Sequence, residues 1–186
     1  MGQKSRAALE KWLTKFPLAV QQAFMAQSIE LATAAGAAQE VPVGAIVVDG
    51  QGQIIGRGEN RRERDADPTA HAEIIALRQA GQHLGNWHLN DCTLYVTLEP
   101  CPMCAGAIIA ARLGLLVYGT DDPKTGAVRT VLNIPDSKAS NHFLSVVAGV
   151  ESDRCQQQLK DWFAQRRKTP REQVVEPDKS LPESPR

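Results

Sequence analysis

The fold is decided by residues 93–104, TLYVTLEPCPMC, in which an apolar run leads directly into a Pro-Cys-x-x-Cys motif. Leucine, tyrosine, valine and threonine predict a buried strand over 93–98, and a helix is expected over 103–112. Cys101 and Cys104 lie three positions apart, so both sulfurs fall on one helix face. A helix N-terminus also favours thiolate, the form of cysteine that binds metal. The stretch therefore predicts two metal ligands where a strand passes into a helix.

Short apolar runs alternate with helical segments on both sides of this unit. The turn Asp49-Gly50-Gln51-Gly52 predicts a hairpin between the first two strands. Alternation of strands with helices of about a dozen residues favours an α/β layered domain. The other expected strands cover 43–48, 53–58, 115–118 and 144–148, and the other helices cover 17–36, 70–79 (closed by Gly81) and 152–168.

The length of 186 residues and the 42% hydrophobic content fit one domain with extensions at its ends. We expect an N-terminal helical extension over 1–16, one main domain that contains the metal ligands over 17–168 and a disordered, proline-rich tail over 169–186. Leu9, Trp12, Leu13 and Phe16 have helical spacing among basic residues. We expect this segment to be a helix that packs on the core or a loosely ordered extension. The alternative is an organellar leader or a membrane-surface element.

The charge and cysteine content limit the class of protein. Lysine plus arginine and aspartate plus glutamate number 21 each, so the formal net charge of zero argues against a generic nucleic-acid coat. A local basic patch is still compatible with RNA binding. Four cysteines without a signal peptide favour metal binding in a reducing compartment over disulfides. No segment reaches transmembrane length, and we expect a cytoplasmic protein.

The motif His71-Ala72-Glu73 supplies the third metal ligand and a spare carboxylate. Zinc held by His71, Cys101 and Cys104 keeps its fourth position open for water, which distinguishes a catalytic site from a structural one. Glu73 is placed to move the proton of that water. The combination predicts a zinc hydrolase that acts on an amino-substituted ring. The alternative is a closed structural zinc site, whose fourth ligand would be Cys92, His83, His88, Cys155 or His142. A closed site would leave Glu73 without a role.

These motifs resemble the H-x-E…P-C-x-x-C signature of the cytidine deaminase-like zinc deaminases. Over about residues 18–168, longer strings narrow the resemblance to the bacterial-type tRNA-specific adenosine deaminases. These strings are Val41-Pro42-Val43-Gly44-Ala45, Asn60-Arg61, Asp67-Pro68-Thr69-Ala70-His71-Ala72-Glu73, Thr93 to Pro100, Ala105-Gly106-Ala107, Lys124-Thr125-Gly126-Ala127 and Asn141-His142.

The resemblance implies a fold, an activity and partners. The fold is a three-layer α/β/α arrangement with a central mixed sheet flanked by helices. The activity is conversion of adenosine to inosine at the anticodon wobble position, position 34, by zinc-activated water with Glu73 as proton shuttle. One zinc per subunit, a homodimer and binding of the tRNA anticodon stem-loop follow from the same resemblance. A single-stranded anticodon base also costs less to flip into a pocket than a paired one.

The resemblance also assigns substrate contacts. Asn60 and Pro100 are expected beside the target nucleoside. Asp122, Lys124, Asn141, Arg166 and Arg167 are expected near the anticodon stem-loop. The alternatives are turn formation for Asp122 and Asn141 and a solvated helix end for the arginine pair. One departure is Glu59, since many relatives carry an aromatic residue before the asparagine; this puts the local loop packing in doubt.

Two other functions remain open. The His-Ala-Glu and cysteine motifs are shared with guanine deaminases, so a free-nucleobase deaminase acting on guanine, or less readily on cytosine, is the first alternative. A non-enzymatic zinc- and RNA-binding subunit is the second, and the presence of Glu73 counts against it.

Overall fold

The structure is a computed structural model that describes residues 10, 12 and 14–168. The predicted tail over 169–186 and most of the predicted extension over 1–16 lie outside the described residues. The elements are α2 (Leu18–Ala37), β1 (Gly44–Val48), β2 (Ile54–Glu59), α3 (Ala72–Leu84), β3 (Thr93–Leu98), α4 (Pro102–Ala110), β4 (Leu115–Thr120), β5 (Ser145–Ala148) and α5 (Ser152–Lys168).

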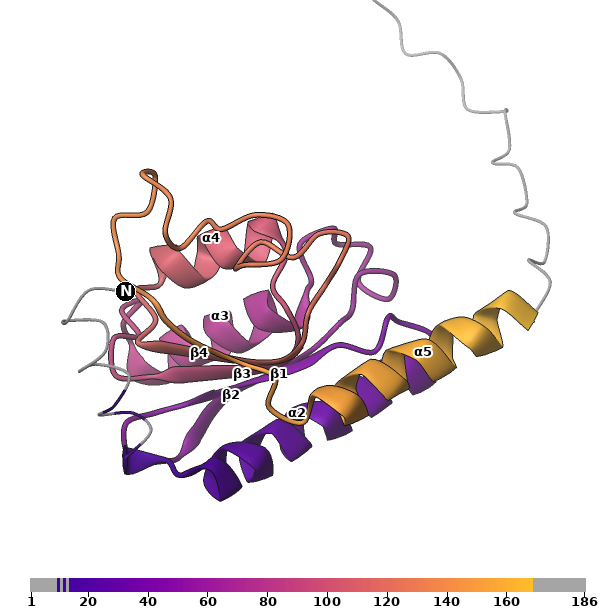
Figure 1. Cartoon of the computed structure of the whole chain (residues 1–186), viewed down its shortest axis with the longest axis horizontal. Coiled ribbons are helices and arrows are strands. Elements are labelled where there is room, and N and C mark those ends of the chain that lie inside the picture. Colours follow the sequence, from indigo (N-terminus) through magenta and orange to yellow (C-terminus); the bar gives the residue numbers. More distant parts are fainter. Residues whose placement is uncertain (1–9, 11, 13, 169–186) are drawn as a thin grey trace, which may run out of the picture.

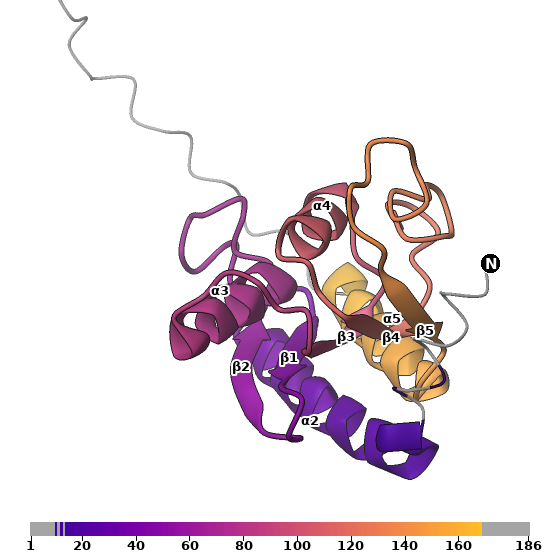
Figure 2. The same cartoon turned by 90° about the vertical axis from the view of Figure 1, so that its left-hand side faces the viewer.

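The strands form a mixed sheet in the order β2-β1-β3-β4-β5. β1 pairs antiparallel with β2 and β3, whereas β4 pairs parallel with β3 and β5. Helices α3 and α4 cover one face of the sheet, and α2 and α5 cover the other (Figures 1 and 2). The predicted three-layer arrangement around a mixed sheet is therefore confirmed.

Both faces of the sheet are buried, which explains the continuous apolar runs of its central strands. Successive residues of a strand point to opposite faces. In β3, Leu94 and Val96 therefore pack on the side of α3 and α4, while Tyr95 packs on the side of α2 and α5. In β4, Leu116 and Val117 divide between the two sides in the same way.

The topology brings three loops to one end of the sheet. Because β1 is antiparallel to both β2 and β3, these two strands run in the same direction, and β4 runs parallel to β3. The carboxyl ends of β2, β3 and β4 therefore lie at one end. The loop before α3, the turn before α4 and the loop 121–144 all begin there. Loop 121–144, orange in Figure 1, rises on the α4 side of the sheet.

Helix α3 extends beyond its predicted end at Gly81. It continues to Leu84, and Gly85 follows with a left-handed φ of 61°. The Gly85 amide donates to the Gln82 carbonyl and the Asn86 amide to the Gly81 carbonyl, a C-terminal motif that requires such a residue. The prediction was wrong because a helix tolerates an internal glycine at a cost of about 1 kcal/mol.

The described part of the N-terminal segment packs against the domain. The buried Phe16 ring stacks on Trp12 at 6.2 Å between centroids and meets the Phe24 ring edge-on at 6.1 Å. Among the described residues, no helix has the length and apolar character needed to span a membrane.

Helix α3 lies directly on strand β2 because two glycines of that strand lack side chains. A Cβ added to Gly58 would lie 2.0 Å from the Ala72 carbonyl oxygen and 2.9 Å from the Ala76 amide nitrogen. A Cβ on Gly56 would lie 2.3 Å from the Ala76 carbonyl oxygen. Since Ala72 opens α3 between His71 and Glu73, this contact sets the position of both predicted functional residues.

Gly58→Ala is expected to lower the free energy of unfolding by about 2 kcal/mol or more, because α3 must move away from the sheet. Gly106→Ala is the matched control: Gly106 lies in α4, and a Cβ there meets no atom within 4 Å. Denaturant titration should find the control unchanged or more stable by up to about 1 kcal/mol. Equal stability of the two variants would contradict the proposed contact.

Candidate active site

Three side chains, His71, Cys101 and Cys104, meet at the end of the sheet where β2, β3 and β4 finish. His71 Nδ1 lies 3.7 Å from Cys101 Sγ and 3.5 Å from Cys104 Sγ. The three ligand atoms all lie within 4.8 Å of one another. One imidazole nitrogen and two sulfurs suit zinc rather than magnesium or calcium, which prefer oxygen. In the described part of the chain, the cluster contains no fourth histidine, cysteine or acidic ligand.

The candidate metal ligands lie at the N-terminal ends of two helices. His71 is the N-cap of α3, and Cys101 is the N-cap of α4 with Pro102 at its first turn. Asp67 prepares the first of these starts, since its Oδ1 accepts hydrogen bonds from the amide and the hydroxyl of Thr69, both at 2.7 Å. Such an aspartate turn stops the preceding loop and directs the chain into the helix.

The two cysteines carry different protonation preferences. Hydrogen bonding from Cys104, and then from His71, lowers the pKa of Cys101 to about 4 against the opposing effect of burial. The pKa of Cys104 is raised because its thiol donates to Cys101 and is buried. Hydrogen bonding therefore favours the thiolate at Cys101, and binding of a metal by both sulfurs would require the thiol proton of Cys104 to leave.

Glu73 lies beside the cluster in the first turn of α3. Its side chain is buried, and burial raises the pKa of its carboxyl group. A raised pKa makes this carboxylate a stronger base than an exposed glutamate, which suits a group that transfers protons. Glu73, His71 and Cys101 line one pocket of about 130 Å³, together with Asn60 and Arg62.

A buried glutamate holds the predicted nucleoside contact in place. Asn60 is buried, and its Nδ2 donates to Glu40 Oε2 at 3.4 Å. The other oxygen of Glu40 accepts the Arg64 amide at 2.9 Å. Glu59 is bound to Arg64 Nη2 at 2.9 Å, so an ion pair occupies the position where the family pattern has an aromatic residue.

A second buried glutamate, Glu99, organises the opposite wall of the pocket. It accepts the backbone amides of Asp122, Val128, Arg129 and Thr130. Neither Glu99 nor Glu40 was predicted from the sequence to have a role in the site. The available signal was an acidic residue directly after the apolar strand over 93–98, where a solvated charge is not expected.

A larger groove of about 550 Å³ adjoins the pocket. Val41, Leu98, Asp122 and Thr125 line both cavities, so they share a wall. The groove runs between loop 121–125 and α5. Its other lining includes the cations Lys124, Lys160 and Arg167 and the aromatic ring of Phe163, which is 44% exposed.

The other predicted contacts lie in different surroundings. Pro100 is buried, and its carbonyl accepts the Ala127 amide at 2.9 Å. Asn141 is exposed on loop 121–144 and is absent from the lining of the pocket and the groove. Arg166 donates to the Gln39 carbonyl at 2.7 Å, and its guanidinium lies 4.8 Å from the centroid of the Trp162 ring, so it ties α5 to the end of α2. The Asp122 carboxylate caps its own loop through Lys124 and Thr125 and also lines both cavities.

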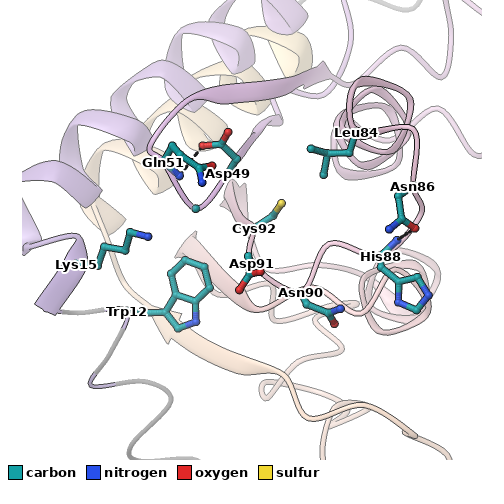
Figure 3. Close-up of a pocket in the computed structure, with 11 residues that line it drawn as sticks. Trp12, Lys15, Asp49, Gln51, Leu84, Asn86, His88, Asn90, Asp91 and Cys92 are labelled. Carbon is teal, nitrogen blue, oxygen red and sulfur yellow. Dashed lines mark hydrogen bonds between the residues drawn. The ribbon is translucent and has the colours of Figure 1, made fainter.

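The residues considered for a closed metal site lie elsewhere. Cys92 lines a separate cavity of about 520 Å³ at the opposite end of β3, together with Asp49 and Asp91 (Figure 3). Burial, and then these carboxylates, raise the pKa of Cys92 to about 11, which disfavours the thiolate. Burial raises the pKa of Cys155 to about 12, and His142 Nε2 lies 2.7 Å from the Leu113 carbonyl oxygen.

Comparison with known proteins identifies the family. A family model described as MafB19-like deaminase matches residues 20–167. The tRNA-specific adenosine deaminase of Haemophilus influenzae is 48% identical over 143 residues, 77% of this chain and 83% of that protein. A structure solved in a study of A-to-I editing by tRNA:A34 deaminases at the wobble position of transfer RNA has a TM-score of 0.71 and 41% identity, covering 73% of this chain and 97% of that chain. A structure of the guanine deaminase from Nitrosomonas europaea has a TM-score of 0.66 and 28% identity, covering 77% and 84% respectively.

The identity and structural similarity are both greater for the tRNA deaminases than for that guanine deaminase. The similarity also spans most of each chain, so it is not limited to the two short motifs. The resemblance deduced from the motifs is confirmed: the chain belongs to the deaminase family, as a member of the tRNA-specific adenosine deaminases.

Proposed function

We propose that this protein is a hydrolase that converts adenosine to inosine at the wobble position of a tRNA anticodon. The observation that carries the proposal is the buried Glu73 beside the His71, Cys101 and Cys104 cluster, at a small pocket that shares a wall with a larger groove. A pocket of about 130 Å³ suits one flipped base, and the groove offers room for its neighbours.

Zinc is the metal that we propose for the cluster, because its donor set is one nitrogen and two sulfurs. Held by His71, Cys101 and Cys104, zinc would lower the pKa of a bound water and so supply a hydroxide nucleophile at neutral pH. Glu73 would take one proton from that water and pass it to the ring nitrogen, and would then move the remaining hydroxyl proton to the amino group, which leaves as ammonia. Asn60, oriented by Glu40, lines the pocket where it can hydrogen-bond the nucleoside.

The groove is the proposed site of the anticodon loop. Lys124, Lys160 and Arg167 supply positive charge for phosphates, and the exposed Phe163 ring can stack on an unpaired base. Asp122 lies at the junction of the pocket and the groove. Pro100, Asn141 and Arg166 remain predicted contacts, and Arg166 already binds the Gln39 carbonyl.

The function is tested with purified, zinc-loaded protein and three substrates in parallel: wobble-adenosine tRNA, guanine and cytosine. Inosine and ammonia should form from the tRNA alone. Glu73→Gln should lower this rate by roughly 10²–10⁴-fold, because proton transfer is lost, while zinc content stays unchanged. Conversion of guanine with untouched tRNA would replace the proposal by a free-base deaminase. Full activity of Glu73→Gln would overturn the proton-transfer role.

Cys101→Ala should lose zinc and stability together, since a bound metal contributes folding free energy. We expect a fall in melting temperature of about 5 °C or more relative to the zinc-loaded parent. Cys92→Ala is the control, because that cysteine lies in the cavity at the other end of β3. It should keep its zinc in metal analysis. Full zinc occupancy in Cys101→Ala would remove Cys101 from the ligand set.

A homodimer is proposed through the outer face of α3 and α4. This face carries a cavity of about 380 Å³ lined by Ile74, Leu77, Trp87 and Ala110, and Trp87 is 61% exposed. Large exposed apolar patches are typical of protein interfaces.

The free thiols and the proposed thiolate metal site favour a reducing compartment such as the cytoplasm.

Trp87→Asp should halve the molar mass measured by light scattering after gel filtration, because a charge would be buried in the interface. Leu18→Asp is the control: Leu18 is 62% exposed, but it lies on α2, across the sheet. A dimeric Trp87→Asp protein would place the interface elsewhere.

A further inference from the structure

Glu99 is a buried carboxylate whose partners come from a single loop. Its side chain is 2% exposed at the end of β3. Its Oε2 accepts the Asp122 amide at 3.1 Å and the Thr130 hydroxyl. Its Oε1 accepts the amides of Val128 at 3.1 Å, Arg129 at 2.8 Å and Thr130 at 3.0 Å. Five neutral donors thus converge on two oxygen atoms.

Only an acceptor without a hydrogen of its own satisfies this arrangement. A carboxylate offers about four lone-pair sites, whereas the NH₂ group of a glutamine would face at least one backbone amide that cannot accept: the Asp122 amide in one orientation, or the three amides of residues 128–130 in the other. The loop also leaves room for this group at Gly126. A Cβ there would lie 2.3 Å from Glu99 Oε2. Loop 122–130 therefore provides both the donors that the Glu99 carboxylate needs and, at Gly126, the space that it occupies.

The loop that Glu99 holds forms a wall of the site. Asp122 and Thr125 line both the pocket and the groove, and Lys124 lines the groove. A second tie joins the same two segments, because the Ala127 amide donates to the Pro100 carbonyl at 2.9 Å. Residues 99 and 100 directly precede Cys101. Hydrogen bonds therefore attach the loop that forms the proposed RNA-binding wall to the chain segment that leads into Cys101.

We propose that Glu99 is a positioning residue, which holds loop 122–130 in the conformation that binds the tRNA substrate. This rests on the proposed function. Glu99 acts through the backbone of the loop, which presents Asp122, Lys124 and Thr125 to the pocket and the groove. Its loss should impair binding of RNA more than the chemical step, because the metal ligands and Glu73 lie on other elements.

The test compares Glu99→Gln with the parent in zinc content, amide hydrogen exchange and steady-state kinetics on wobble-adenosine tRNA. We expect unchanged zinc content and faster exchange at the amides of residues 122–130. We expect KM for tRNA to rise by about tenfold or more, with kcat within about threefold of the parent. Thr130→Val removes one of the five donors and should give a smaller rise in KM. Thr130→Ser keeps the hydroxyl and should restore the KM of the parent.

A control separates positioning from general loss of stability. Leu115→Ala truncates a buried side chain at the far end of β4 and should lower the melting temperature while KM stays unchanged. If Leu115→Ala raises KM as much as Glu99→Gln does, the effect is only structural and the proposal is overturned. Unchanged KM in both Glu99→Gln and Thr130→Val overturns it as well.

The exchange measurement also separates this proposal from the proposed function. If the parent leaves tRNA unconverted, the proposed function is wrong, and the holding of the loop is then judged by exchange alone. Exchange in Glu99→Gln as slow as in the parent would show that the carboxylate does not hold the loop. That result overturns the positioning role whatever the substrate is.

Discussion

The site depends on the close approach of helix α3 to strand β2. His71 and Glu73 flank Ala72, whose carbonyl oxygen occupies the space where a side chain of residue 58 would be. This contact fixes the start of α3 relative to the sheet, and the sheet in turn fixes the start of α4 through β3. The three ligand atoms lie within 4.8 Å of one another only because both helix starts are set against the same layer. A catalytic geometry within a few tenths of an ångström requires such rigid support.

Two buried carboxylates extend this support to the loops around the pocket. Glu40, 1% exposed, binds Asn60 and the Arg64 amide on one side, and Glu99 binds loop 122–130 on the other. Burying a charge is costly unless hydrogen bonds replace its water. In both cases the replacements are mainly donors of a loop that has no regular structure. In a helix or a sheet, backbone amides donate to backbone carbonyls. In each of these loops, a single glutamate side chain accepts backbone amides instead.

The α/β layering, the β1–β2 hairpin and the grouping of His71, Cys101 and Cys104 could be predicted from the sequence because they depend on short-range patterns. Apolar runs, the spacing of Cys101 and Cys104 and the His71–Glu73 motif are all local. The end of α3 was predicted wrongly because Gly81 and Gly85 differ only in the backbone conformation that the fold imposes. The roles of Glu40 and Glu99 depend on partners 24 and 31 residues away, and no local pattern specifies such partners.

The net charge of zero has a physical consequence for a protein that binds RNA. Long-range attraction is weak when 21 cations balance 21 anions, so binding must depend on where a few charges lie. The groove is lined by Lys160, Phe163 and Arg167 of α5 and by Lys124 of loop 122–130. If the anticodon loop binds there as we propose, stacking and phosphate contacts would act together over a short distance, which would favour an unpaired loop over a duplex. Because one wall of that groove is a loop with no helix or strand of its own, RNA bound there as we propose would depend for its affinity on whatever keeps the loop in place.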